Sequence, residues 1–121
     1  MTDTTLTFRF AERKDTTLIL RFIRELARYE KIIKELAVYE KMLDEVIADE
    51  IMLEEWIFDK QKAEVLFAVV EEKEIGFALF FHNFSTFLGR AGIYLEDLYV
   101  MPDYRGHGFG KAILQKLAAI A

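Results

Sequence analysis

Three glycines at alternate positions mark the stretch of this 121-residue chain with the clearest chemical potential. Gly106, Gly108 and Gly110 follow an apolar segment and precede an amphipathic one, which predicts a strand, a loop and a helix. Because glycine has no Cβ, the backbone of such a loop can approach a bulky ligand closely. The helix that follows would direct its unpaired N–H groups and the positive end of its dipole at the loop. With Arg105 and Lys111 adding positive charge, the loop predicts a phosphate or pyrophosphate site.

Two common phosphate loops do not fit this spacing. A P-loop requires Gly, four residues and then Gly-Lys-Ser/Thr, but here Lys111 is followed by Ala112, and Arg105 stands where the first glycine should be. A dinucleotide fingerprint requires G-x-G-x-x-G and an acidic residue about 20 positions later, whereas this loop reads G-x-G-x-G and the sequence ends at Ala121. A third pattern, Arg-x-x-Gly-x-Gly after a strand, is matched in full by residues 105–110.

This third pattern, with the preceding L-E-D-L-Y-V-M-P-D-Y, resembles the pyrophosphate loop of the GNAT superfamily of acetyl-CoA-dependent N-acetyltransferases. The N-terminal F-R-F-A-E-R-K-D and I-L-R-F-I-R-E-L-A-R-Y-E-K resemble the diamine, spermidine/spermine and thialysine acetyltransferase branch. The resemblance covers nearly the whole chain. It implies an α/β GNAT fold with a mostly antiparallel sheet, in the order β-α-α-β-β-β-α, ending before the fifth strand. Residues 1–121 would then be a single, partial GNAT domain, roughly the N-terminal two-thirds.

The same resemblance implies that Glu96 is the catalytic and substrate-binding carboxylate. A primary amine with a pKa near 10.4 is neutral in only about one molecule in 10³ at pH 7. Attack on a thioester requires that neutral form, so a carboxylate must bind the ammonium and relay its proton. Strand alternation directs Asp97 to the opposite face, which makes it the weaker candidate. The alternative for Glu96 is an exposed strand carboxylate with no role in the reaction.

The resemblance also implies how acetyl-CoA would be held, as a co-substrate and without a metal. The backbone of Leu98, Tyr99 and Val100 would donate to the thioester oxygen and pair with the pantetheine arm. The loop would hold the pyrophosphate through its N–H groups, with these residues in contact: Arg105, Gly106, His107, Gly108, Phe109, Gly110 and Lys111.

A short repeat supplies two candidate pairs for binding the amine. The segment 25–31, E-L-A-R-Y-E-K, recurs ten residues later as E-L-A-V-Y-E-K, which indicates a recent duplication or an engineered insertion. Ten residues are nearly 2.8 helical turns, so the two copies would face about 80° apart. In the relatives a Tyr-Glu pair on the first helix contacts the amine, and either Tyr29-Glu30 or Tyr39-Glu40 could match it. For either pair, boundary packing on an amphipathic helix is the alternative.

Composition limits the remaining function classes. The chain has 53% hydrophobic residues and no apolar run of 18 or more, so it predicts a folded domain and no membrane span. The absence of cysteine excludes thiol chemistry and favours the cytoplasm. His82 and His107 lie in different segments, so no metal site is expected. A net charge of −5 argues against nucleic acid.

Hydrophobic periodicity places these residues on a small set of elements. The expected strands are Leu6–Phe10, Glu64–Val70, Ile75–Phe81 and Ile93–Val100, with a turn at 71–74 and a loop at 82–89. The expected helices begin at Thr16, with Asp15 as N-cap, and cover 43–58 and 108–121. The inward positions of the last two helices would be Val46, Ile47, Leu53, Trp56, Ile57, Ile113, Leu114, Leu117 and Ile120.

Three functions are compatible with this sequence. The first is acetyl transfer to a primary amine of a diamine, polyamine or lysine-like molecule. The second is a non-catalytic acetyl-CoA-binding fragment or an engineered helix-duplication form of such an enzyme. The third is an interaction scaffold, which requires the apolar stripe from Ile19 to Leu36 to face a partner. Because the fourth strand would leave an apolar edge unpaired, a homodimer or a complex with a C-terminal fragment is also expected.

Overall fold

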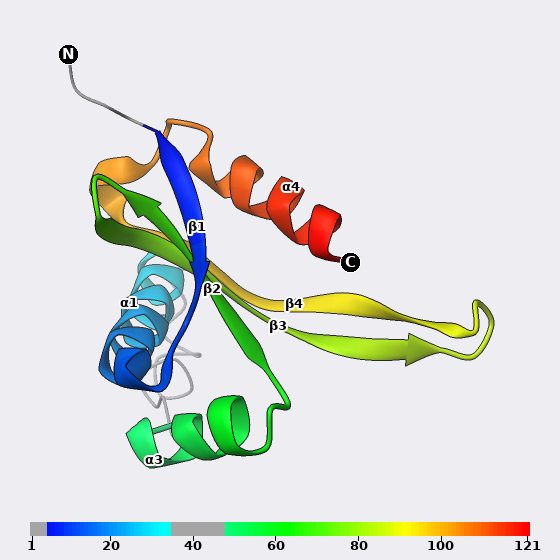
Figure 1. Ribbon diagram of the computed structural model, residues 1–121. Coiled ribbons are helices and arrows are strands. Elements are labelled where there is room, and N and C mark those ends of the chain that lie inside the picture. Colours follow the sequence, from blue (N-terminus) through cyan, green and yellow to red (C-terminus); the bar gives the residue numbers. More distant parts are fainter. Residues whose placement is uncertain (1–4, 35–47) are drawn as a thin grey trace.

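The computed structural model describes residues 5–34 and 48–121, and within them one antiparallel sheet carries helices on both faces (Figure 1). Four strands in these ranges follow the order β1-β2-β3-β4: β1 Leu6–Phe10, β2 Glu64–Val70, β3 Lys73–Ser85 and β4 Arg90–Val100. The helices are α1 Thr16–Lys34, α3 Glu50–Leu53 and α4 Phe109–Ile120. The outer half of the β3–β4 hairpin extends well beyond β1 and β2 (Figure 1).

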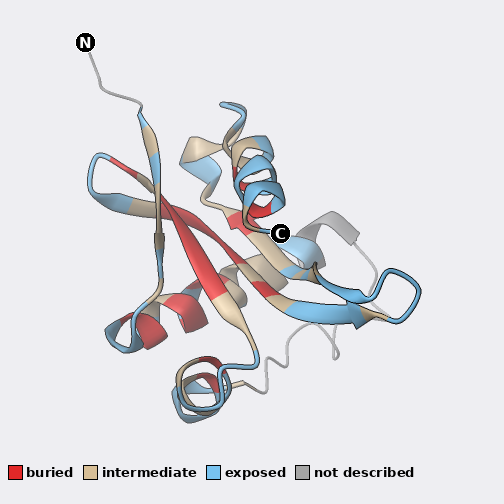
Figure 2. Ribbon diagram, turned by 45° about the vertical axis from the view of Figure 1, so that its right-hand side comes forward, coloured by how far each residue is buried: buried red, intermediate tan, exposed pale blue. Residues whose placement is uncertain are grey.

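Strand β2 separates two hydrophobic cores, as its continuous apolar sequence predicts. Val65 and Phe67 pack with Ile19 and Phe22 of α1, whereas Leu66 faces the core that α4 completes. The buried residues concentrate where β2 and β3 pass between the helices (Figure 2). Since Ile19 and Phe22 are fully buried against their own sheet, the described part of the α1 stripe does not face a partner, and the scaffold hypothesis is wrong there.

The prediction of a loop at residues 82–89 is wrong for the first four of these residues. His82–Ser85 continue β3 and pair with residues 90–93, so that β4 begins at Arg90 instead of Ile93. Asn83 pairs with Gly92, and the rings of Phe81 and Tyr94 stack at 5.0 Å. These cross-strand contacts extend the hairpin through polar residues that carry no strand signal of their own.

Asp15 is not the N-cap of α1. It is the last residue of a 3-10 turn, Arg13–Asp15, that runs directly into the helix. Its carboxylate accepts a hydrogen bond from the Glu12 N–H at 2.8 Å and two from the Arg9 guanidinium at 2.8 and 2.9 Å. Arg9 also donates to Glu74 at 2.8 Å, so this network ties β1, the start of α1 and β3 together. The bonds from Arg9 and then the bond from Glu12 hold the pKa of Asp15 below its usual range, against the opposing effect of burial.

Asp15→Asn should lower the free energy of unfolding at pH 7 by about 1–3 kcal/mol, because Arg9 loses one of its two charged partners. A carboxylate whose pKa is lowered by folding stabilises the protein above its unfolded pKa and loses that contribution as pH falls. The difference between the two proteins should therefore shrink below about pH 4. Urea unfolding at pH 7 and pH 3 measures it. Glu55→Gln, which breaks the exposed pair with Lys60, is the control and should change little.

The predicted helix over residues 43–58 is only partly seen, because 43–47, with Val46 and Ile47, lie outside the described residues. The described part begins at Glu50, where the Asp49 side chain accepts from the Met52 N–H at 2.8 Å. A π-helix, Glu54–Asp59, follows α3 directly. Leu53 and Ile57 are buried as predicted. The prediction that Trp56 points inward is wrong, because its side chain is 48% exposed.

The inward face of α4 is mostly as predicted. Ile113 and Leu117 are buried in the core between α4 and the sheet, and Ile120 packs against it. Leu114, predicted to point inward, is 46% exposed. The apolar stripe of this helix is therefore narrower than the sequence indicates.

Candidate functional site

The glycine loop lies between the end of β4 and the start of α4, as predicted. Gly106 and Gly108 have φ angles of 81° and 78°, in the left-handed region where residues with a Cβ are strained. Gly108 is the N-cap of α4 and has no side chain to cap it, so the first-turn N–H groups are left for another acceptor. A Cβ added at Gly106, Gly108 or Gly110 would meet nothing within 4 Å. Open space therefore lies beside the loop at all three glycines, which fits a phosphate-bearing ligand.

The positive side chains of the loop lie in two different environments. Lys111 is exposed in the first turn of α4. Arg105 instead turns back, with Nε donating to the carbonyl oxygen of Val100 at 2.8 Å. Its guanidinium carbon lies 3.9 Å from the centre of the Tyr29 ring and 5.5 Å from that of Tyr99. His107 is exposed, and its ring stacks on Phe109 at 5.6 Å.

Glu96 is the extra residue of a β-bulge. Asp97 pairs with Leu79 and Leu95 with Phe80, which leaves Glu96 without a register partner on β3. A bulge interrupts strand alternation, so alternation does not separate Glu96 from Asp97. The role assigned to Glu96, which is exposed, stays a prediction.

Asp97 is a half-buried carboxylate of β4 with a raised pKa. It lies two residues before Tyr99 without a further register shift, so it shares the face of β4 that packs on α1. Burial first, and then the charges of Glu96 and Glu30, raise the pKa of Asp97 to about 6. The fold thus brings Glu30 of α1 close enough to act electrostatically on Asp97 of β4. Alternation alone made Asp97 the weaker candidate, and the sequence carried no signal for this contact.

A pocket of about 290 Å³ opens between α1 and the end of β4, and Tyr29, Tyr99 and Arg105 are among the residues that line it. Tyr99 is buried, and its hydroxyl donates to Glu25 at 2.8 Å. Burial, followed by this hydrogen bond, raises the pKa of Tyr99 to about 12. Glu25 was not among the predicted site residues. Its only sequence signal is its position four residues before Tyr29, on the same side of the helix.

Of the two Tyr-Glu pairs predicted to bind the amine, one lies within the described residues and the other does not. Tyr29 lines the 290 Å³ pocket, and Glu30 is exposed and close enough to influence Asp97. Tyr39-Glu40 lies outside the described residues. Leu98 and Val100 pack towards α4, while their backbone belongs to β4, at the edge of the sheet in the described part of the chain. The expected pairing of this edge with a second copy or a C-terminal fragment stays a prediction.

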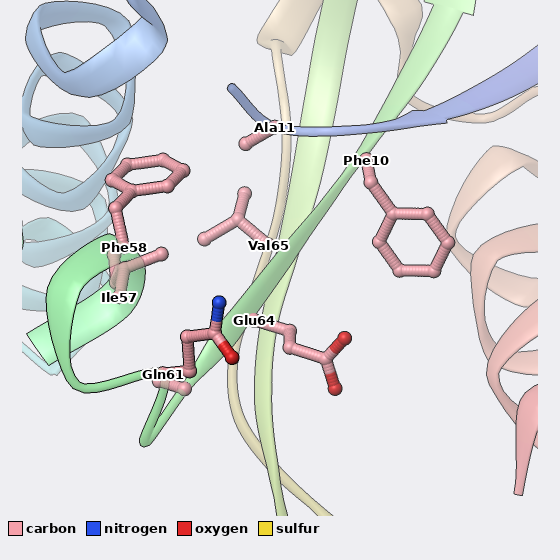
Figure 3. A pocket seen from close by; sticks show the side chains of 8 residues that line it. Phe10, Ala11, Ile57, Phe58, Gln61, Glu64 and Val65 are labelled. Carbon is pink, nitrogen blue, oxygen red and sulfur yellow. The ribbon is translucent and has the colours of Figure 1, made fainter. Parts of the chain in front are cut away.

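A larger pocket, of about 430 Å³, lies at the other end of β2 and lacks these chemical features. Phe10, Ile57 and Phe58 line it together with Gln61 and Glu64, and the Glu64 carboxylate points away from the Phe58 ring (Figure 3). The Glu64 carboxylate forms a hydrogen bond with Nε2 of His82 at 2.8 Å. We therefore place the candidate site at the glycine loop and not here.

The described part of the chain contains neither a metal-binding cluster nor a membrane-spanning helix. Residues 5–34 and 48–121 hold no group of three or more His, Asp or Glu side chains placed to bind a metal ion. No helix in the same ranges is both long enough and apolar enough to cross a membrane.

The antiparallel sheet and the uncapped glycine loop agree with the result of sequence comparison: the chain belongs to the Acetyltransferase (GNAT) family, whose profile matches residues 23–121. It is 39% identical to the thialysine N-ε-acetyltransferase of Bos taurus over 116 residues. That alignment covers 93% of this chain and 65% of the bovine protein.

Solved structures show the same fold at low sequence identity. An aminoglycoside acetyltransferase from a soil metagenome, in complex with sisomicin, has a TM-score of 0.68 at 17% identity, covering 95% of this chain and 68% of that one. A predicted acetyltransferase from Clostridium acetobutylicum, solved with acetyl-CoA, has a TM-score of 0.63 at 17% identity, covering 97% and 73%. The predicted α/β GNAT fold with its antiparallel sheet is thereby confirmed.

Proposed function

We propose that this protein transfers the acetyl group of acetyl-CoA to a primary amine of a small cationic molecule, such as a diamine, a polyamine or a lysine-like amine. The observation that carries the proposal is the position of two features, one on β4 and one shortly after it. The half-buried Asp97 lies on β4 with Glu96 and Glu30 nearby, and the uncapped glycine loop follows β4 after the short 3-10 helix Pro102–Tyr104. The likeness to a thialysine acetyltransferase supports a lysine-like acceptor.

The carboxylates would bind and deprotonate the amine. The negative charges of Glu96 and Glu30 near Asp97 favour an ammonium ion. Because Glu96 and Asp97 interact, the proton would pass to the pair and not to one isolated residue. A pKa of about 6 leaves Asp97 mostly ionised at pH 7 and still basic enough to accept a proton. The acceptor would thus become neutral where it meets the thioester.

The bond changes follow from this placement. The neutral amine attacks the thioester carbonyl, and a C–N bond forms as the carbonyl oxygen becomes an oxyanion near the β4 backbone. The C–S bond then breaks, and the CoA thiolate takes up the second proton that leaves the nitrogen. The products are an acetamide and free CoA, while the first proton returns from the carboxylate pair to water. The loop N–H groups and Lys111 would hold the pyrophosphate throughout.

A second candidate is an acetyl-CoA-binding module without turnover. The observation behind it is that the matched region spans 65% of the length of the bovine relative. The two candidates share the glycine loop and differ only in the chemical step.

Calorimetric titration with acetyl-CoA, followed by assay of free CoA thiol with diamines, polyamines and lysine analogues, tests both. We expect acetyl-CoA to bind and at least one amine to release thiol. Binding without thiol release for any amine would leave the second candidate. Absence of acetyl-CoA binding would reject both.

A further inference from the structure

We propose that Arg105 is a positioning residue that couples the glycine loop to α1 through Tyr29, so that a residue on the acceptor side helps to set the affinity for acetyl-CoA. The proposal rests on the proposed function and adds to it. A side chain expected to supply charge to the phosphates would instead hold the loop in place.

The contacts of Arg105 form a closed path between three elements. Within the loop, Arg105 directly precedes Gly106, whose positive φ sets the following turn. The Nε bond of 2.8 Å fixes Arg105 to Val100, the last residue of β4. Its guanidinium covers the Tyr29 ring of α1 at 3.9 Å. Tyr99 closes the path from β4 to α1 through its 2.8 Å bond to Glu25. The loop is therefore held from both α1 and β4.

The chemistry of this position suits arginine and not lysine. Arginine can donate along its edge through Nε while its planar face lies on an aromatic ring. A lysine ammonium is a point charge, which cannot make both contacts in this geometry. Arg105→Lys thus keeps the charge and removes the coupling, which separates this role from that of a phosphate ligand.

The ring of Tyr29 is the matching half of the contact. Tyr29→Leu removes the ring, whereas Tyr29→Phe removes only the hydroxyl and keeps the surface on which Arg105 lies. If Arg105 binds the phosphate directly, neither substitution of Tyr29 should change the affinity for acetyl-CoA. If Arg105 positions the loop, only Tyr29→Leu should lower that affinity.

The first measurement is a double-mutant cycle on acetyl-CoA affinity by calorimetry. We expect Tyr29→Leu and Arg105→Lys each to weaken acetyl-CoA binding roughly five- to thirty-fold. The double variant should bind acetyl-CoA about as tightly as the single variant with the lower affinity, because both changes remove the same contact. Tyr29→Phe should bind like the unmodified chain. Normal binding by Tyr29→Leu, or additive losses in the double variant, would overturn the proposal.

The second measurement needs no ligand. In amide hydrogen exchange of the free protein, Tyr29→Leu should accelerate exchange at residues 101–108 and leave the core strand segment 65–70 unchanged. Faster exchange throughout would indicate a general loss of stability, and unchanged exchange at 101–108 would indicate no coupling; either result contradicts the proposal. If the unmodified chain fails to bind acetyl-CoA, the proposed function fails, while this exchange experiment still decides the coupling.

Discussion

Gly108→Val is expected to weaken acetyl-CoA binding by at least about a hundredfold, close to 2.7 kcal/mol. At a φ of 78° a β-branched residue is strained, so the loop must either bear that strain or move. Its methyl groups would project into the open space beside the first-turn N–H groups of α4, where a phosphate would bind. No protein atom lies within 4 Å of the added Cβ, so packing of the fold is not the cause of the loss. Calorimetry with acetyl-CoA measures the effect.

Gly89→Val is the matched control. Gly89 also has a positive φ, 65°, and a Cβ there also meets nothing within 4 Å, but it lies in the turn between β3 and β4. The two variants should lose similar stability, about 1–2 kcal/mol each in urea unfolding. Only the Gly108 variant should lose the ligand. Normal binding by Gly108→Val would reject the loop as the phosphate site, and equal loss in both variants would point to stability alone.

Asp97→Asn should lower turnover by about 10²–10⁴-fold and leave acetyl-CoA affinity nearly unchanged. The amide cannot accept the ammonium proton, while the glycine loop is untouched. In the unmodified chain, turnover at limiting amine should rise as pH increases through about 6, because Asp97 ionises in that range. Initial rates of thiol release from pH 5 to pH 8 measure this profile, and the Asn variant should lose the rise.

The same substitution should increase stability at pH 8. Folding raises the pKa of Asp97 to about 6, so its carboxyl contributes most below the unfolded pKa and loses that contribution as pH rises through the folded value. At pH 8 the ionised, half-buried group is therefore unfavourable. Its removal should add on the order of 1–2 kcal/mol to the free energy of unfolding, after allowance for solvent screening.

Glu96→Gln and Asp103→Asn test whether the effect belongs to Asp97. Asp103 is an exposed carboxylate near the glycine loop, and its variant should keep full turnover. A loss in Glu96→Gln similar to that in Asp97→Asn would support the pair. Full turnover in Asp97→Asn with loss in Glu96→Gln would leave Glu96 as the base, as the sequence resemblance implied.

The parts of the fold that could be predicted are those whose residues carry a local signal. Leu6–Phe10 and Glu64–Val70 begin and end where predicted, because alternation or an unbroken apolar run determines a strand. The loop of residues 105–110 was located by its glycines, two of which adopt a positive φ. The conformation of such residues can be predicted from the local sequence alone.

The remaining features depend on contacts between distant residues. Asp15 was expected to cap α1. Its carboxylate instead accepts hydrogen bonds from Arg9, because β1 lies beside the start of the helix. Trp56 follows a helical stripe in the sequence but lies in a π-helix, whose wider turn changes which side chains face inward. The placement of Arg105 on Tyr29 joins residues 76 positions apart, which no spacing rule reveals. These tertiary contacts determined the details of the candidate site.

The bulge at Glu96 also limits how the β3–β4 hairpin can change in length during evolution. One unpaired residue lets Leu95 and Leu98 face the same core although they are three positions apart. Deletion of a single residue of β4 between the bulge and the turn would move the residues beyond it to the opposite face of that strand, while β3 would keep its own alternation. Insertions and deletions within one strand are therefore expected there in pairs, because two residues restore its alternation. Homologous hairpins should differ in length by even numbers of residues, with the bulge as their fixed reference point.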